Sequence, residues 1–147
     1  MNDYISNEFW LGFQVLVAIL LGAILGWQRK SWGKSAGPRT YALVTGGSAL
    51  FTILARAGFG SLAGGSGIAA GIVTGIGFLG AGLIFHREEH IDGLTTAAGL
   101  WASAAIGMAV GTSHYILAIL TTVLVLVVLA LDDERLHTKN TRLLKKD

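Results

Sequence analysis

Between Gly93 and Leu131 the sequence contains no lysine, arginine, aspartate or glutamate. The charged side chains between residues 9 and 85 are all basic and belong to Arg29, Lys30, Lys34, Arg39 and Arg56. Of the 147 residues, 52% are hydrophobic and 14% are charged, whereas soluble domains carry roughly 25% charged residues. This distribution predicts an integral membrane protein in contact with the lipid bilayer. We expect no nucleic-acid binding, because the basic residues lie in clusters at the predicted membrane edges.

The apolar segments predict an all-α fold, a polytopic membrane helix bundle of about five transmembrane helices. The first segment has about 19 residues, enough for a helix to cross roughly 30 Å of hydrocarbon. Trp10 and Trp27 lie at its two ends, where aromatic rings prefer the headgroup level. The predicted transmembrane domain covers residues 1–131, and a short charged cytoplasmic tail covers 132–147. The five spans are approximately 9–27, 39–57, 67–85, 94–110 and 115–131.

The basic residues also indicate an orientation. Loop 28–39, loop 86–93 and the tail from residue 132 carry four, one and five lysines or arginines, respectively. Five spans place these three segments on one side, whereas Arg56 lies on the other side. Because cytoplasmic segments carry the excess of lysine and arginine, the N-terminus is predicted outside and the C-terminus in the cytoplasm. A four-span arrangement would separate loop 28–39 from the tail.

The third span is rich in glycine, which weakens a helix in water by about 1 kcal/mol per residue relative to alanine. In a bilayer, small residues instead let helix backbones approach one another closely. At 100° per residue, small residues occupy two sides of this helix, and a bulky stripe of Ile72, Ile76, Leu79 and Leu83 lies between them. We therefore expect a helix packed between neighbours, with the bulky stripe facing lipid or another subunit. The predicted packing glycines are Gly67, Gly71, Gly75, Gly77, Gly80 and Gly82.

A second interpretation of the same span is a substrate path. The missing side chains could leave a polar route lined by Thr74 and backbone carbonyls. The segment 75–80 also matches GxGxxG, the dinucleotide fingerprint, but that motif requires a strand before it and a helix opening at it. Gly33-Lys34-Ser35 resembles the end of a phosphate-binding loop, yet the required glycine is replaced by Gln28. We reject both motifs.

The loop 86–93 is acidic enough to hold a hard cation loosely through Glu88, Glu89 and Asp92. The interpretation that we favour is a solvated loop whose charges mark the membrane edge. The spans contain no carboxylate, and no nucleophile–histidine arrangement is evident. The sequence therefore predicts a protein that is not an enzyme and has no cofactor, catalytic residue or resident metal.

Polar residues at the edges of the spans are the candidates for a functional site. Arg39 begins the second span, and Thr40, Thr45, Ser48 and Thr52 follow it along the same helix. Hydroxyls within spans commonly bond to their own helix carbonyls or bridge two helices, so they make a site possible without proving one. The full set of candidate functional residues is Arg29, Lys34, Arg39, Thr40, Ser48, Thr74, Asp92, Thr95, Thr96 and Trp101.

Several of these residues belong to blocks that resemble the MgtC/SapB family of bacterial inner-membrane proteins, which have about five spans. Together the blocks cover most of residues 26–111 in the family's order and spacing. They are Gly33-Lys34-x-Ala36-Gly37-x-Arg39-Thr40, Leu43-Val44, Gly47-Ser48-Ala49-Leu50-Phe51-Thr52, Gly75-Ile-Gly77-Phe-Leu-Gly80-Ala-Gly82 and Gly93-Leu94-Thr95-Thr96-Ala97-Ala98-x-Leu100-Trp101.

The chain also departs from the family pattern. Gln28 precedes Arg29 where family members usually have glutamate, Pro38 replaces leucine, and Tyr41 replaces a common histidine. Only the short tail 132–147 stands where some members carry a sizeable cytoplasmic domain. The resemblance implies a role in adaptation to low magnesium or in virulence, and some members are thought to regulate other membrane proteins rather than to transport magnesium.

Two functional hypotheses remain open. The first is a non-enzymatic regulator that contacts membrane-protein partners through its helices and forms a homodimer or higher homo-oligomer. The second is a small transporter or channel for Mg²⁺ or another ion or solute, motivated by Arg39, the hydroxyls of the second span, and Thr95 and Thr96. Cation conduction usually requires acidic rings or carbonyl filters, and the spans have no acidic residue, so an anion path or a regulated pore fits better.

Overall fold

The computed structural model describes residues 2–58, 62–87 and 90–143. The described chain is all-α, with five helices and one small β-hairpin. This agrees with the predicted fold class and helix number, while the membrane boundaries and orientation stay predictions. The elements are α1 (Asn2–Ser31), α2 (Pro38–Gly58), α3 (Leu62–Ala81), β1 (Phe85–Arg87), β2 (His90–Asp92), α4 (Leu94–Gly111) and α5 (Tyr115–Leu143).

Local chemistry explains where several helices begin and end. After α1, Gly33 adopts a left-handed backbone with φ of 69°, and the N–H of Lys34 donates to the Arg29 carbonyl. Helix α2 begins at Pro38, where the missing N–H of proline is not needed. Helix α4 ends in a similar turn, in which Ser113 takes the left-handed position with φ of 64°. Glycine usually fills this position, so the serine calls for a separate explanation.

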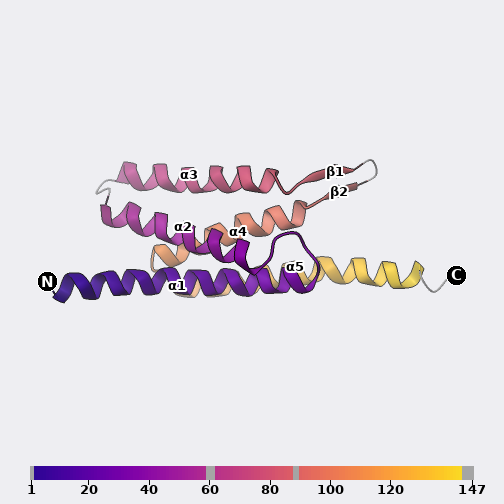
Figure 1. The fold of residues 1–147 in the computed structure, drawn as a ribbon, viewed down its shortest axis with the longest axis horizontal. Coiled ribbons are helices and arrows are strands. Elements are labelled where there is room, and N and C mark those ends of the chain that lie inside the picture. Colours follow the sequence, from indigo (N-terminus) through magenta and orange to yellow (C-terminus); the bar gives the residue numbers. More distant parts are fainter. Residues whose placement is uncertain (1, 59–61, 88–89, 144–147) are drawn as a thin grey trace.

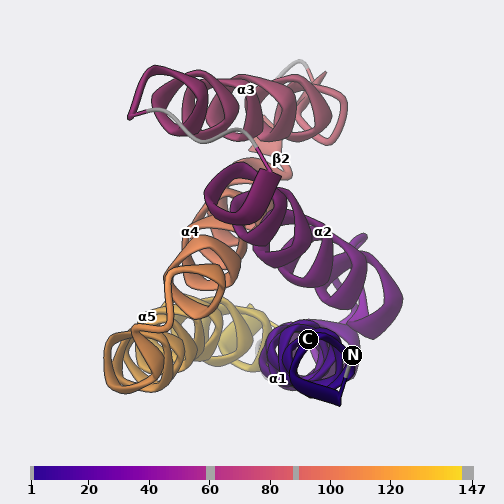
Figure 2. The same cartoon turned by 90° about the vertical axis from the view of Figure 1, so that its left-hand side faces the viewer.

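The helices form three layers. Helices α2 and α4 occupy the middle layer, with α3 on one side of them and α1 and α5 on the other (Figure 2). The connection between α1 and α2 and the hairpin β1–β2 lie at the same end of the bundle as the end of α5, and the N-terminus lies at the opposite end (Figure 1).

Two described helical segments are long and apolar enough to cross a membrane, Asn7–Ser31 and Leu94–Gly111. Shorter apolar segments occupy Gly65–Ala81 and Tyr115–Leu131. Large apolar side chains are exposed on α1, α2, α3 and α5, including Phe9, Leu43, Phe78 and Leu124. These features are compatible with a helical membrane protein.

The connection between α3 and α4 is an antiparallel hairpin. Phe85 pairs with Asp92, His86 with Ile91, and Arg87 with His90. Residue 85, which lies in the predicted third span, thus begins a strand, and α3 ends earlier, at Ala81. Gly93 then turns the chain into α4 with φ of 89°, a left-handed conformation that strongly favours glycine.

Helix α2 is the centre of the fold, because glycines of α1 and α4 pack directly against it. A Cβ atom added to Gly22 would lie 2.6 Å from the Tyr41 carbonyl oxygen, and one added to Gly26 would lie 2.5 Å from the Pro38 Cα. Such distances leave no room for a side chain. The backbones of α1 and α2 therefore approach as closely as small-residue stripes allow in membrane helix pairs.

Helix α4 contacts the opposite side of α2 through a stripe of small residues spaced by four. A Cβ on Gly107 would overlap the Thr45 carbonyl oxygen and lie 2.9 Å from the Ser48 Cβ. A Cβ on Gly111 would lie 2.7 Å from the Ala49 carbonyl oxygen. We call this stripe the α4 seam. Its members are Gly99, Ser103, Gly107 and Gly111, and all four are buried.

Candidate functional site

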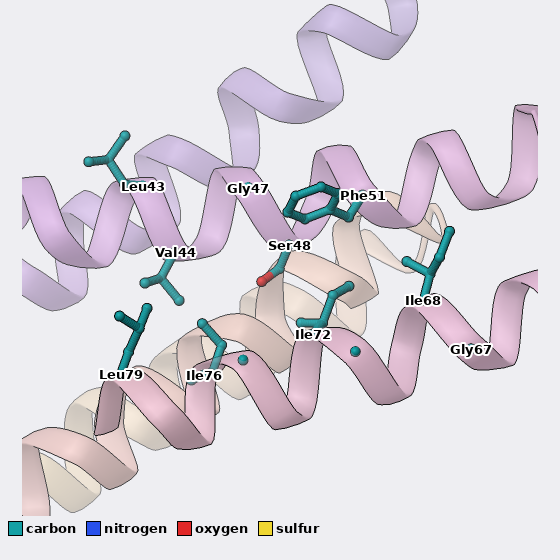
Figure 3. Close-up of a pocket in the computed structure, with 12 residues that line it drawn as sticks. Leu43, Val44, Gly47, Ser48, Phe51, Gly67, Ile68, Ile72, Ile76 and Leu79 are labelled. Carbon is teal, nitrogen blue, oxygen red and sulfur yellow. The ribbon is translucent and has the colours of Figure 1, made fainter. Parts of the chain in front are cut away.

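An apolar groove of about 670 Å³ lies between α2 and α3. Figure 3 shows side chains of both helices pointing into it. Its rim is open, since Leu43 is 74% exposed. The residues that line it are Leu43, Val44, Gly47, Ser48 and Phe51 from α2 and Gly67, Ile68, Gly71, Ile72, Gly75, Ile76 and Leu79 from α3.

The bulky stripe of α3 was predicted to face lipid or another subunit, but two of its four residues also pack inward against α4. Ile72 and Ile76 are buried in a cluster with Ala104 of α4, and Met108 packs against the same cluster. The physical reason is that α4 supplies the small residue here, so bulky side chains of α3 fill the space between the two helices. Leu79 remains 52% exposed at the end of the stripe.

The glycines of α3 are mostly uncovered, so the prediction that this helix is packed on two sides is wrong within one chain. A Cβ added to Gly67, Gly71, Gly75 or Gly77 would meet no atom within 4 Å. Gly80 does pack, since its Cβ would lie 3.4 Å from the Cβ of Ala97 in α4. At Gly82 the nearest atoms are carbonyl oxygens of α3 itself, those of Leu79 and Phe78.

Most buried hydroxyls bond to a carbonyl of their own helix. Thr45 donates to the Tyr41 carbonyl at 2.8 Å, and Thr52 donates to the Ser48 carbonyl at 2.7 Å. In α4, the Ser103 hydroxyl donates to the Leu100 carbonyl oxygen at 2.8 Å. These bonds leave no polar lining on the α2 face that α4 covers.

The Ser48 hydroxyl differs from its neighbours. Ser48 is 3% exposed, and its oxygen points from α2 into the groove (Figure 3). It makes no hydrogen bond with any other residue that the structure describes. A hydroxyl without a partner in an apolar environment is costly. Ser48 is thus the polar point of an otherwise apolar groove.

A second polar site lies near the opposite edge of α2, around a buried arginine. Arg29 of α1 is fully buried and interacts with the hydroxyl of Tyr41. That hydroxyl also lies 3.4 Å from the Thr96 carbonyl oxygen, to which it donates. Three helices therefore meet at Tyr41. The absence of a side chain at Gly99 lets the tyrosine ring approach α4, since a Cβ atom added to Gly99 would lie 2.5 Å from the tyrosine oxygen.

Gln28 has a structural role beside this arginine. Its Nε2 donates to the Leu126 carbonyl at 3.0 Å and so connects α1 with α5. An ionised glutamate has no N–H and could not donate this bond. The departure from the family pattern at this position therefore fits the observed packing.

At the other end of the bundle, Arg56 caps helix α4. Its Nη1 donates to the Gly111 carbonyl at 2.8 Å and lies 3.4 Å from the Ser113 hydroxyl. Gln14 of α1, which is 2% exposed, donates to the same hydroxyl at 3.4 Å. A cation at a helix C-terminus is favourable. Arg56, the basic exception to the predicted orientation, thus has a structural explanation, as does the serine at position 113.

Ser113 offers a test of this cluster. Ser113→Ala keeps the left-handed strain and loses the hydroxyl, so we expect it to lower the free energy of unfolding by about 1 kcal/mol. Ser113→Gly loses the same hydroxyl but relieves the strain, which is worth about 1 kcal/mol. It should therefore stay near wild type. Reversible unfolding by SDS titration in mixed micelles measures the stability of both variants. An alanine variant as stable as wild type would contradict the role of the hydroxyl, and one as stable as the glycine variant would contradict the left-handed strain.

The remaining candidate residues do not converge on one site. Arg39 and Thr40 are exposed at the start of α2, Thr95 is half-buried and Thr96 is buried at the start of α4. Thr74 and Trp101 are exposed, Lys34 is half-buried, and Asp92 is exposed at the end of β2. The proposed cation ligands Glu88 and Glu89 lie outside the described residues. Tyr41, Gln14 and Ser113, which connect distant helices in the structure, are not among the residues predicted from the sequence.

One family model and several known proteins match most of this chain. The model of the MgtC family matches residues 15–138. The relative named "Putative magnesium transporter YhiD" from Escherichia coli (strain K12) is 45% identical over 140 residues, which cover 90% of this chain and 63% of that protein. Protein SrpB from Synechococcus elongatus is 38% identical over 142 residues, with 86% of this chain and 78% of SrpB covered.

A third relative, protein MgtC from Salmonella typhimurium, is 43% identical over 126 residues. The match covers 86% of this chain and 51% of that protein. The chain therefore spans between half and two thirds of the length of YhiD and MgtC. No solved structure matches the chain.

Proposed function

The chain belongs to the MgtC family, and on that premise we propose that it is a multi-pass protein of the bacterial inner membrane. Within that membrane it acts as a non-enzymatic regulator, which contacts other membrane proteins through the sides of its helices. The process that it serves is adaptation to magnesium limitation, stress or growth in a host. The name of YhiD, which refers to magnesium, supports this context.

The observation that carries the regulator role is the chemistry of the groove. The groove is apolar apart from Ser48, so it offers an ion no continuous polar path. Arg39 and Thr95, the residues expected along a transport path, do not line it. The hydroxyls of Thr45, Thr52 and Ser103 are bonded to carbonyls of their own helices and are not arranged to replace an ion's hydration shell.

A small transporter is the second candidate function. The name of YhiD favours it, as does the complete burial of Arg29, because an ionisable residue within a membrane bundle often marks an ion pathway. In that case the transported ion would pass Arg29 and Tyr41, and helices α1, α2 and α4 would need to separate to open a path for it.

Flux through proteoliposomes separates the two functions. We expect purified protein to carry no more Mg²⁺, K⁺, chloride or phosphate than vesicles without protein. Membrane proteins cross-linked to the chain in cells grown at low magnesium would then be reconstituted with it, and their activity should change. Specific flux that Arg39→Gln or Arg29→Gln abolishes, with the fold intact by circular dichroism, would overturn the regulator role.

A further inference from the structure

The glycine stripe of α3 is uncovered, unlike two other small-residue stripes among the described residues, those of α1 and α4. Gly22 and Gly26 of α1 pack against α2, and the α4 seam packs against its other side. On α3, Gly67, Gly71 and Gly75 repeat the same spacing of four, but an added Cβ at any of them would meet nothing within 4 Å. Such stripes let helix backbones approach closely in membranes. The surface at the rim of the groove therefore has room for the close approach of another helix.

Two hydroxyls lie beside this stripe without a hydrogen bond to any described residue. Ser48 is 3% exposed as a residue, and its hydroxyl points into the groove (Figure 3). The Thr74 side chain is exposed on α3. Ile72 faces the groove opposite Ser48. Thr74 is two residues further along α3, and at a rise of 1.5 Å per residue it lies about 3 Å from Ile72 along the helix axis. The two hydroxyls therefore lie at nearly the same depth in the bundle.

Within one copy these hydroxyls cannot meet, because they lie on opposite sides of the glycine stripe. At 100° per residue, Ile72 is displaced from Gly71 by about 100° towards α2 and α4, and Thr74 by about 60° in the opposite sense. Consistent with this, Ile72 lines the groove and Thr74 does not. Helix α2 therefore flanks the stripe on one side, and Thr74 flanks it on the other.

The two hydroxyls can meet between two copies of the chain that are related by a two-fold axis along the membrane normal. This axis brings two α3 helices together in parallel, glycine stripe against glycine stripe, and each stripe is complementary to itself. The rotation places the side of one α3 that carries Thr74 next to the α2 of the other copy. Because the axis is parallel to the membrane normal, every residue keeps its depth. Thr74 of each copy then faces Ser48 of the other copy.

We propose that the occupant of the groove is a second copy of this chain. The two copies cross at Gly67, Gly71 and Gly75 of α3, and Thr74 of each copy hydrogen-bonds to Ser48 of the other. The proposal rests on insertion in a membrane but not on the regulator role. A lipid acyl chain would fill the space but could not bond to Ser48 at this depth, whereas a second copy supplies both the small stripe and the hydroxyl.

The association of purified protein with itself provides the first test. Energy transfer between labelled copies in lipid vesicles, measured as the protein-to-lipid ratio falls, gives the dissociation constant. Gly71→Leu should raise it at least tenfold. The matched control is Gly77→Leu, on the same helix and equally uncovered, but outside the groove lining. It should change the constant less than twofold. A monomeric wild-type protein, or equal effects of both variants, would overturn the proposal.

Cross-linking tests the hydroxyl contact. The chain has no cysteine, so single cysteines can be introduced cleanly. Copies carrying Ser48→Cys, mixed in vesicles with copies carrying Thr74→Cys, should form a disulfide under mild oxidation. Copies carrying Ser48→Cys mixed with Gly77→Cys copies should not, because their sulfur atoms cannot reach bonding distance. Cross-linking to the control as efficiently as to Thr74→Cys would overturn the arrangement. So would a groove occupied by lipid or a foreign helix, which leaves both mixtures uncross-linked.

Discussion

Replacing Gly107 with alanine is expected to lower the free energy of unfolding by about 3 kcal/mol or more, the upper range for overpacking a filled site. The added Cβ would overlap the Thr45 carbonyl oxygen and lie 2.9 Å from the Ser48 Cβ. The first of these is backbone of α2, which cannot move aside as the end of a flexible side chain can. The methyl group therefore forces α4 away from α2 along their whole contact, and much of the protein should fail to fold when expressed.

The matched control is Gly77→Ala, in which a helical glycine faces open space. Alanine is the better helix former by about 1 kcal/mol in water, so this variant should be as stable as wild type or slightly more stable. SDS titration in mixed micelles, combined with the yield of monodisperse protein, compares the two. Equal stability of the two variants would show that the α2–α4 contact relaxes without cost, and would remove α2 from the centre of the fold.

The sequence predicts five helices well because each apolar run is bounded by glycine, proline or charge. It does not predict which helix is central. Gly67, Gly71 and Gly75 of α3 and the α4 seam show the same spacing of four, and both stripes lie in charge-free segments. Spacing indicates that a helix approaches a stripe but not whether that helix belongs to the same chain. The greater number of glycines in α3 favours α3 as the closely packed helix, whereas in the structure glycines of α1 and α4 pack against α2.

The candidate site was only partly predictable for a related reason. Ser48 was among the candidates. The sequence does not show, however, whether its hydroxyl bonds to its own helix, as those of Thr45 and Thr52 do, or points into the groove. From the sequence, Arg56 is only a basic residue on the side of the membrane opposite the basic loops. Its contact with the Gly111 carbonyl joins residues 55 positions apart, which local patterns cannot reveal. The fold therefore follows from local chemistry, whereas the site follows from contacts between distant helices.

The hairpin determines where α3 lies relative to α4, and Gly93 is the position at which this can be tested. Its φ is 89°, and a Cβ there would overlap the Leu83 carbonyl oxygen. Gly93→Ala combines left-handed strain of about 1–2 kcal/mol with a backbone overlap, so we expect a loss of about 3 kcal/mol in the free energy of unfolding. Gly33 has a similar φ of 69° but nothing within 4 Å of an added Cβ.

Gly33→Ala therefore measures the strain alone, and we expect it to cost about 1 kcal/mol. SDS titration gives both values, and the difference between them is the cost of the overlap between Gly93 and Leu83. Because Leu83 lies two residues after the end of α3, relieving that overlap should shift the helix. Gly93→Ala should therefore also weaken the association of two copies through the α3 stripe, while Gly33→Ala should not. If the two variants lose equal stability and associate equally well, the hairpin does not hold α3 in place, and the width of the groove must be set by the contacts of Ile72 and Ile76 with α4 alone.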